Sequence, residues 1–345
     1  MTVYRSPLLD RHGAVPADDP DAGVAGHYGD PIREQRRLAE RAGWVDLSHR
    51  DVVRIEGADR LSWLHNLSTQ RLDTLEAGAG VETLVLSPQG HVEHHLALVD
   101  DGEATWAHVE SGRGEALVAF LDSMRFMLRV SVADVTSEWA LAWQPSSQPH
   151  PRLLSRVDPE ADTVAGRQVF VPRAALNVFA EEAEAPAGVQ ALEALRIEAG
   201  RPRFGLDTDH RTIPHEVGWI GTAVKLDKGC YRGQETVARV VNLGRPPRRL
   251  VRLHLDGSVR ETLPPRGSPV LVDDAVIGQL TSSAYHYELG PIALALVKYA
   301  TADDVDVAVG ADDKAISARL EAVVERDDGP RPGQAARAAF RRSLL

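Results

Sequence analysis

The chain of 345 residues is too long for one ordinary hydrophobic core, so we expect two or three domains. Its composition, 43% hydrophobic and 26% charged, is typical of a soluble globular protein, and it lacks the run of about 18 apolar residues that a transmembrane helix needs. The net charge of −11 argues against a general nucleic-acid or anionic-membrane binder, and the single cysteine excludes an intramolecular disulfide and indicates a cytoplasmic location.

The first part of the chain predicts an acidic arm followed by an α+β domain. Residues 1–30 are rich in proline, glycine and aspartate, and we expect them to be disordered. Residues 31–145 form the N-terminal domain, whose first helix begins after the Asp30-Pro31 cap and ends at Gly43. The other elements predicted in this domain are helices at 58–67 and 112–128 and strands at 44–47, 51–55, 81–86, 91–99, 104–109, 129–135 and 139–143.

The second part of the chain predicts another α+β domain, a β-barrel and a tail. Residues 146–246 form the second domain, in which a long irregular segment at 201–222 either lines a channel or faces solvent. Its other elements are a strand at 168–171 and helices at 173–184, 189–199 and 234–241. Short alternating strands at 250–255, 270–272, 275–283, 292–299 and 316–324 predict an antiparallel barrel over residues 247–325, and residues 326–345 predict a loose basic tail.

The segment 225–235 contains the only cysteine of the chain, Cys230, among closely spaced cations. Lysine is rare among the 39 basic residues, so Lys228 marks a position where a compact ammonium is needed instead of a planar guanidinium. The cations and the helix that follows favour the thiolate of Cys230 over the thiol. We therefore expect a reactive cysteine with Lys228 as the group that keeps it ionised. A small, buried and inert thiol is the alternative interpretation.

Residues 228–235, Lys-Gly-Cys-Tyr-x-Gly-Gln-Glu, resemble the signature of the YgfZ family of folate-binding proteins, which are similar in fold to the glycine cleavage T-protein. Segments similar to the T-protein family also occur elsewhere between residues 40 and 325, among them 86–90 and 196–200. The resemblance implies an α+β fold of three domains that form a ring around a central folate channel, with a C-terminal antiparallel β-barrel. It allows the first domain to be discontinuous in sequence.

The resemblance also implies a ligand and its contacts. Tetrahydrofolate or a one-carbon derivative is the expected cofactor. Glu198 matches the glutamate that binds the pterin ring in the T-protein, and a carboxylate can accept two parallel N–H bonds from the amino-pyrimidine edge of that ring. Arg196, Tyr231 and Gln234 are the other residues expected to bind the folate.

The pair His94-His95 is the main departure from the T-protein pattern. Aminomethyltransferases of this fold carry an aspartate pair at about these positions, and one of the aspartates assists the chemistry at the folate nitrogen. An imidazole cannot replace a carboxylate that stabilises an iminium-like intermediate, so we predict that aminomethyl transfer is lost. No metal site is expected here, because neighbouring side chains on a strand point in opposite directions.

The resemblance implies a tetrahydrofolate-binding protein that supports the assembly or repair of iron–sulfur enzymes through Cys230. Its expected partners are folate and iron–sulfur client or assembly proteins, with no nucleic acid and no membrane. One cysteine cannot hold a cluster alone, so any cluster contact would be shared with a partner. The alternative is a folate-dependent aminomethyl or methyl transferase of the T-protein type. A scaffold that binds folate and a partner without chemistry is the third hypothesis.

Overall fold

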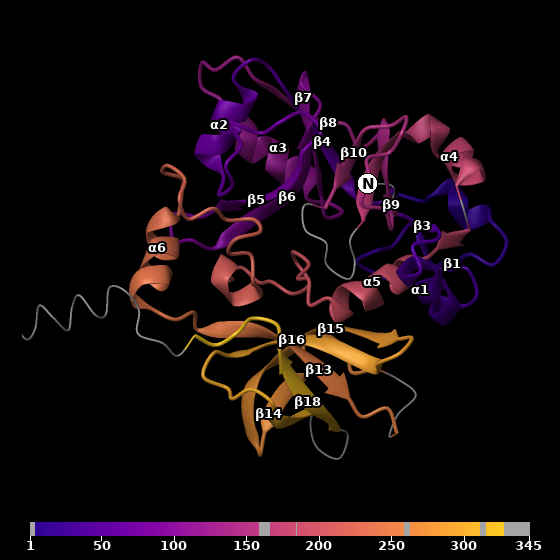
Figure 1. Cartoon of the computed structure of the whole chain (residues 1–345), viewed down its shortest axis with the longest axis vertical. Helices are drawn as coiled ribbons and strands as arrows, with labels where there is room; N and C mark the ends of the chain where they lie inside the picture. Colours follow the sequence, from indigo (N-terminus) through magenta and orange to yellow (C-terminus); the bar gives the residue numbers. More distant parts are fainter. Residues whose placement is uncertain (1–3, 159–165, 184, 259–262, 311–314, 328–345) are drawn as a thin grey trace, which may run out of the picture.

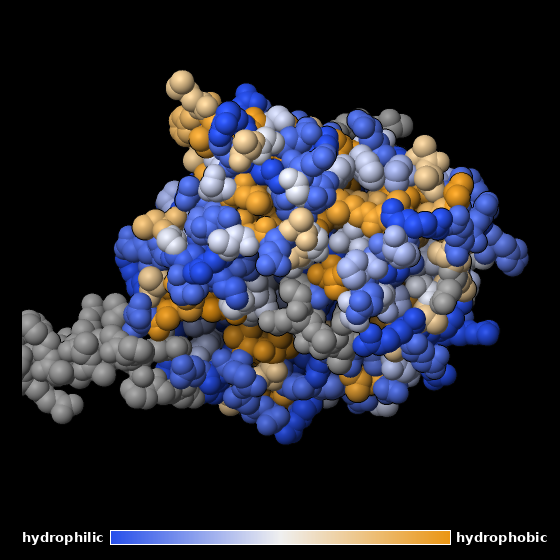
Figure 2. Space-filling view, turned by 45° about the horizontal axis from the view of Figure 1, so that its top comes forward, coloured by the Kyte–Doolittle hydropathy of each residue, from blue (hydrophilic) through white to orange (hydrophobic). Residues whose placement is uncertain are grey.

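The computed structural model describes residues 4–158, 166–183, 185–258, 263–310 and 315–327. Two open sheets, each with its own helices, lie above a closed β-barrel, and the irregular segments that join them fill the middle of the molecule (Figure 1). The α+β class and the arrangement in three parts follow the prediction. The surface shown in Figure 2 is mostly hydrophilic and is interrupted by several hydrophobic patches.

The first sheet is antiparallel, with the strand order β5-β6-β7-β4-β8. Its strands are β4 (Asp51–Glu56), β5 (Gly80–Leu86), β6 (Val92–Asp100), β7 (Ala104–Val109) and β8 (Ser131–Asp134). Helices α2 (Arg60–Leu67) and α3 (Gly114–Ser123) pack on one face, where Leu64 and Leu117 meet Leu96 and Leu98. Because side chains alternate along a strand, the neighbours of Leu96 and Leu98 on β6 point to the other face. That face borders the centre of the molecule.

The second sheet has the order β10-β11-β9-β3-β12 and combines segments from far apart in the sequence. Its strands are β3 (Trp44–Asp46), β9 (Trp139–Gln144), β10 (Ser155–Val157), β11 (Arg167–Pro172) and β12 (Pro186–Ala187). The helices beside it are α1 (Pro31–Ala39), η2 (Arg173–Ala175), α4 (Leu176–Glu182) and α5 (Val189–Glu198). Because β9 pairs with β11 and β3 pairs with β12, strands from both sides of the boundary predicted at residue 145 share this sheet.

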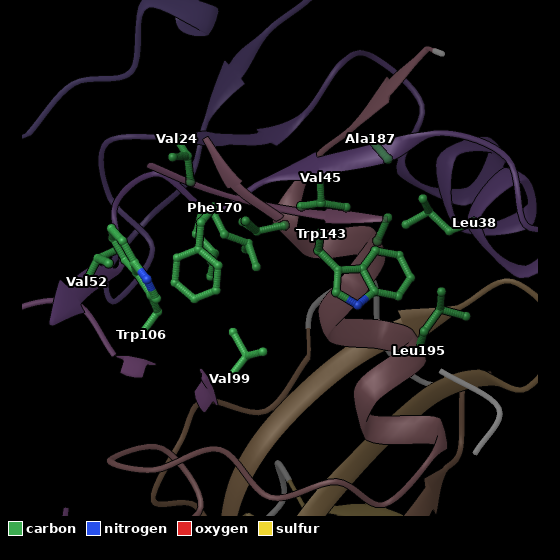
Figure 3. Close-up of a cluster of buried hydrophobic side chains, with 14 of the residues drawn as sticks. Val24, Leu38, Val45, Val52, Val99, Trp106, Trp143, Phe170, Ala187 and Leu195 are labelled. Atoms are coloured by element: carbon green, nitrogen blue, oxygen red, sulfur yellow. The ribbon is translucent and has the colours of Figure 1, made fainter. Parts of the chain in front are cut away.

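The core between this sheet and α5 is apolar and closely packed. Figure 3 shows Trp143 of β9 beside Leu195 of α5, with Val45 on the neighbouring strand and Phe170 further along the sheet. All four side chains are at most 4% exposed. Burying an apolar side chain of this size stabilises the folded state by roughly 1.5–3 kcal/mol, so this core fixes α5 against the sheet.

The C-terminal part is a closed six-stranded antiparallel barrel, as predicted. Its strands are β13 (Arg248–Leu255), β14 (Pro269–Val272), β15 (Ala275–His286), β16 (Gly290–Lys298), β17 (Asp306–Val309) and β18 (Ile316–Ala322). The barrel closes where β18 pairs with β13, Val251 opposite Ala322. Val251, Leu253 and Leu255 alternate into its core, which is the period-two pattern that predicted these strands.

The expectation of a disordered arm at residues 1–30 is wrong for residues 4–30, and residues 1–3 lie outside the described chain. This segment forms η1 (Pro7–Asp10), β1 (Val15–Pro16) and β2 (Ala25–His27). Leu8 is buried in the second-sheet core and Val24 is completely buried beside it. The acidic, glycine-rich composition of this segment predicted disorder. It does not indicate these contacts, because their partners lie much later in the sequence.

The long segment 201–222 packs across the middle of the molecule. It contains η3 (Pro214–Val217), and Val217 and Trp219 pack into an apolar cluster with Leu84 and Leu86 of β5. Helix α6 (Gln234–Leu243) follows. Across the described ranges, no helix combines the length and the apolar character needed to cross a membrane. Of the predicted basic tail, only Arg326 and Asp327 lie within the described chain.

Candidate functional site

A cavity of about 660 Å³ lies between the three parts of the molecule, within the usual size range of ligand pockets. The first sheet, the second sheet with α5, and the segment 199–225 supply most of its wall, and the end of the barrel contributes Val323. Arginine and lysine side chains outnumber carboxylates in this wall. The cavity therefore suits a ligand that combines an apolar or aromatic body with negative charge.

His95 of β6 and Trp219 form one wall of the cavity. Their rings stack with centroids 4.9 Å apart and planes 13° apart, and His95 Nε2 lies 3.3 Å from Oε2 of Glu82 on β5. Burial alone would raise the pKa of Glu82, but the hydrogen bond and charge of His95, with Arg156 nearby, hold this pKa well below its ordinary value. A carboxylate therefore orients an imidazole whose ring faces the cavity.

His94 points to the opposite face of β6, as the alternation of side chains requires. Its ring packs on Phe120 of α3, with centroids 5.6 Å apart, and burial lowers the pKa of His94. Only His95 of this pair belongs to the cavity. Among the residues that the structure describes, no three His, Cys, Asp or Glu side chains come together as metal ligands.

Arg156 of β10 approaches the oxygen of Glu82 that His95 does not contact. Its guanidinium donates to Asp158 at 2.6 Å and to Gln168 at 2.7 Å, and reaches Glu82 Oε1 at 3.4 Å. The Arg156 side chain is only 1% exposed, and its charge is compensated by Asp158 and Glu82. Because such a buried cation needs both its charge and its N–H groups satisfied, this cluster holds Glu82 in one place.

Arg203, from the long segment 201–222, forms ion pairs with three carboxylates at the other end of the cavity. It donates to both oxygens of Asp21, at 2.6 and 2.8 Å, and lies 2.7 Å from Glu110 and 3.2 Å from Glu193. His49 approaches Asp21 at 2.8 Å. Burial alone would raise the pKa of Asp21, but these two partners lower it strongly. The N-terminal segment, the first sheet and α5 are therefore tied together at one buried guanidinium.

Arg196 lines the cavity, where the sequence placed a ligand contact, but its guanidinium already has protein partners. It contacts Glu193 at 3.0 Å, Asp207 at 2.7 Å and Ser282 of β15 at 2.9 Å. Asp207 also accepts hydrogen bonds from Ser282 and from its neighbour Thr281. Arg196 thus fixes α5 to the long segment and to the barrel.

Glu198 does not line the cavity, and its contact with a pterin ring stays a prediction. Glu193, Arg196 and Gly200 follow the helical spacing of three and four residues and line the cavity, whereas Glu198 lies on the other side of α5. Its backbone oxygen accepts a hydrogen bond from Arg252 of the barrel. Burial raises the pKa of Glu198, and Arg252 opposes this change. The cavity carboxylate on this helix is Glu193.

The ammonium of Lys228 is bonded to the backbone of another part of the chain. Its ammonium donates to the backbone oxygens of His65, Ser68 and Gln70, at and just after the end of α2. Burial lowers the pKa of Lys228 to about 8. No hydrogen bond joins it to Cys230 in the described part of the chain. The lysine therefore caps a helix whose last carbonyls would otherwise be unsatisfied.

Tyr231 and Gln234 also lie outside the cavity wall. Tyr231 is buried in the apolar cluster around Trp219, where burial raises its pKa to about 12, and the Lys228 ammonium lies 5.2 Å from the centre of its ring. Gln234 is the first residue of α6. Gly233 before it has φ +81°, and a Cβ there would lie 2.5 Å from the Ser87 carbonyl oxygen, so only glycine fits.

Cys230 is the one predicted reactive residue that the fold leaves at the surface, as an exposed cysteine outside any disulfide. Lys225, five residues earlier, lines the cavity, but Cys230 does not. The residues of segment 225–235 therefore have different surroundings. Lys225 lines the cavity, Lys228 caps a helix, Tyr231 is buried in the core and Cys230 is exposed. The roles expected for Cys230 and Lys228 as a reactive pair, and for Tyr231 and Gln234 as folate contacts, stay predictions.

The sequence did not indicate the residues that make up most of the cavity wall. Glu82, His108, Glu110 and Glu193 come from three separate elements and have no local spacing in common. Arg203 could be suspected, because long irregular segments inside compact proteins are often functional. Only the phase of α5, with Glu193 and Arg196 on one face, offered a direct signal.

Comparison with known proteins agrees with this architecture. Residues 248–324 match the family model of the glycine cleavage T-protein C-terminal barrel domain. The crystal structure of the glycine cleavage system aminomethyltransferase T from Bartonella henselae superimposes with a TM-score of 0.78 at 19% identity, over 92% of this chain and 95% of that one. The chain therefore has the T-protein fold.

Two relatives of known name share fewer than 30% of the aligned residues with this chain, although its fold is that of the T-protein. An aminomethyltransferase of Moorella thermoacetica is 28% identical over 348 residues, which cover 89% of this chain and 94% of that protein. A protein of Arabidopsis thaliana, named as an inferred chloroplastic transferase, is 27% identical over 291 residues, 72% of this chain. The aligned region spans 64% of that relative's length, which is less than two thirds. This chain is thus T-protein-like, with a T-protein C-terminal barrel.

Proposed function

We propose that the protein binds a reduced folate in the central cavity and transfers a one-carbon group to or from it. The observation that supports this most directly is the cavity, which lies at the junction of all three parts of a T-protein fold. Its size, its stacked aromatic wall and its mixture of cations and carboxylates suit a flat heterocycle that carries an acidic tail. The relatives named aminomethyltransferase support the transferase class.

The two ends of a folate would need different partners. The amino-pyrimidine edge presents parallel N–H donors, and Glu193 is the carboxylate on α5 that lines the cavity. The glutamate tail carries carboxylates, and Arg201 and Lys225 are cavity cations suited to bind them. In this proposal Glu193 takes the role that the sequence gave to Glu198.

His95 is the residue best placed to move a proton in the cavity. When a one-carbon group joins a folate nitrogen, that nitrogen loses a proton, and the group that leaves the carbon takes one up. An imidazole held by Glu82, with its Nε2 3.3 Å from the carboxylate, can accept and return this proton. Because a carboxylate is absent at this position, we retain the prediction that aminomethyl transfer is much slower than in a true T-protein.

Calorimetry with tetrahydrofolate tests the binding part of the proposal. The wild-type protein should bind, and Glu193→Gln should weaken binding about tenfold by removing a charge-assisted hydrogen bond. Glu198→Gln is the matched control on the other side of α5 and should leave the affinity unchanged. An absence of binding by the wild-type protein would overturn the proposal. A loss confined to Glu198→Gln would restore the assignment made from the sequence.

The transferase part has a separate assay. Formation of methylene-tetrahydrofolate from an aminomethylated lipoyl protein should be slow, and His95→Asp should raise the rate if a carboxylate is the missing group. A wild-type rate close to that of a true T-protein would contradict the prediction about His95. It would leave the folate-binding proposal intact.

A second function is supported by Cys230. We infer that an exposed thiol, in a segment whose other signature residues have structural tasks, serves a partner protein, which agrees with support of iron–sulfur enzymes. The test is the activity of such enzymes in cells that lack the native protein. Cys230→Ala should fail to restore that activity at normal protein abundance, whereas Gly229→Ala, a neighbouring substitution with open space around it, should restore it. Full restoration by Cys230→Ala would exclude this function.

A further inference from the structure

His108 of β7 has no place in the mechanism above, yet it faces the same cavity. In the antiparallel pair of β6 and β7 it lies opposite Ala97, so His95 is its diagonal neighbour on the same sheet face. Its side chain packs near the edge of Phe170, with ring centroids 6.4 Å apart. Two imidazoles therefore point from adjacent strands into one cavity.

The two imidazoles differ in their partners. His95 Nε2 is held by Glu82, whereas His108 Nε2 is buried with no hydrogen-bond partner among the described residues. His108 is only 6% exposed overall. Buried polar atoms in native proteins nearly always have a partner, and one left without a partner costs about 1–3 kcal/mol. Because His108 lines the cavity and its ring lacks a hydrogen-bond partner among the described residues, the ring is a candidate ligand contact.

The surroundings of His108 determine what it can bind. The charged and titratable groups that act on it are Arg50, Arg156, His95 and Glu82, and burial together with the two arginines lowers its pKa well below the ordinary value. The ring is therefore neutral and offers one donor and one acceptor nitrogen. An acidic group of the ligand would be held better by the cavity arginines. A neutral amide-like group suits His108.

We propose that His108 is a specificity-determining residue whose neutral imidazole forms a hydrogen bond with the neutral amide-like edge of the heterocycle bound in the cavity. This inference rests on the proposed folate function and adds a contact for the ring. The ring of a reduced pterin contains an N–H group next to a carbonyl, which is the chemistry that a neutral imidazole can bind. In this proposal His108 forms a hydrogen bond with the ring, while the cavity cations bind the acidic tail.

Two substitutions at this position and one control test the proposal by calorimetry with tetrahydrofolate. His108→Phe keeps an aromatic ring without nitrogen and should weaken binding about 10- to 30-fold. His108→Gln retains a neutral hydrogen-bonding group near the position of Nε2 and should stay within about threefold of the wild type. His94→Phe changes the adjacent histidine on the opposite face of the first sheet and should leave the affinity unchanged.

Thermal unfolding separates a ligand contact from a purely structural residue. Without ligand, His108→Phe should have a Tm equal to or above that of the wild type, because a buried unpaired nitrogen is removed. Its Tm should rise less when tetrahydrofolate is added. A lower Tm without ligand, combined with unchanged affinity, would overturn the proposal.

Histidine ring-nitrogen NMR on the wild-type protein keeps the proposal testable if His108→Phe does not fold. The His108 ring signals, identified by their absence in His108→Gln, should shift when tetrahydrofolate is added, and those of His94 should not. Unshifted His108 signals in a protein that binds folate would overturn this inference and leave the folate function standing. No binding by the wild-type protein would overturn both.

Discussion

The central cavity and the segment 225–235 use charged residues in opposite ways. In the cavity wall, arginines and carboxylates are buried against one another, so Arg203 is 3% exposed and bonded to Asp21 on both oxygens. In the segment, the hydrogen bonds of the buried cation Lys228 go to backbone carbonyls, and Cys230 is exposed. The first region surrounds a cavity with paired charges, and the second presents a single thiol to the outside.

This difference shows that a distinctive sequence motif and the central cavity lie largely in different parts of the molecule. Lys228, Tyr231 and Gly233 are each explained by a local structural need: a helix cap, a core contact and a left-handed turn. The cavity residues are scattered along the chain and show no motif. The substitutions that follow test this contrast, from the largest expected effect on stability to the smallest.

Asp21→Asn should have the largest effect, because it leaves Arg203 with less compensation inside the protein. Breaking one side of a buried ion pair costs about 3–5 kcal/mol. The folded-state pKa of Asp21 is lowered, so its contribution is complete above about pH 4, the usual aspartate value, and is lost as the pH falls toward the folded-state pKa. Urea unfolding of the wild type and of Asp21→Asn should be measured between pH 7 and pH 3. The difference between their free energies of unfolding should become smaller below about pH 4. A gap that widens in acid would contradict this assignment.

Lys228→Met should cost about 2–3 kcal/mol, because the apolar stem stays while three backbone carbonyls lose a charged donor. The measurement is the free energy of unfolding in urea at pH 7. Thiol alkylation of Cys230 should proceed at the same rate in Lys228→Met as in the wild type, because the ammonium does not contact the sulfur. A slower reaction together with unchanged stability would support the role that the sequence gave to Lys228.

Gly233→Ala should cost about 1–2 kcal/mol, since alanine is strained at φ +81° and its Cβ would press on the Ser87 carbonyl. Gly229→Ala is the matched control in the same segment, where nothing lies within 4 Å of an added Cβ. It should change stability by less than about 0.5 kcal/mol. Equal effects of the two substitutions would mean that α6 is not locked to the β5–β6 turn through Gly233.

Cys230→Ala should have the smallest effect, below about 0.5 kcal/mol, because the side chain is exposed. In the wild type, a thiol reagent should modify Cys230 completely under native conditions without a fall in Tm. Modification that requires denaturant would show that the thiol is buried, which is the alternative interpretation of the sequence.

Much of the fold was predictable because its signals are local. The alternation of Val251, Leu253 and Leu255 indicated barrel strands, and the Asp30-Pro31 cap gave the start of α1, where Asp30 accepts a hydrogen bond from the backbone of Arg33. The second sheet was harder to predict, because β3 and β9 are separated by the whole of the first sheet. Local patterns do not report which distant strands pair.

The candidate site was predicted poorly for the same reason. Glu198 and Glu193 both lie on α5 near apolar residues, and composition alone does not decide which face of the helix meets the cavity. The contacts of Arg203 with Asp21 and Glu110 come from three distant parts of the chain. Strand alternation placed His94 and His95 on opposite faces, but it did not indicate which of them faces the cavity.

The bond between Asp21 and Arg203 joins positions 182 residues apart, and this separation matters while the chain is being made. At roughly 5–20 residues per second, about 10–35 s pass between the synthesis of the carboxylate and that of the guanidinium. During this interval Asp21 lacks the guanidinium that binds both of its oxygens. Nascent-chain proteolysis should therefore cut the N-terminal 30 residues in shorter ribosome-bound chains and spare them once Arg203 has emerged. The bond that ties Asp21 to the long segment is therefore among the last of its contacts to form.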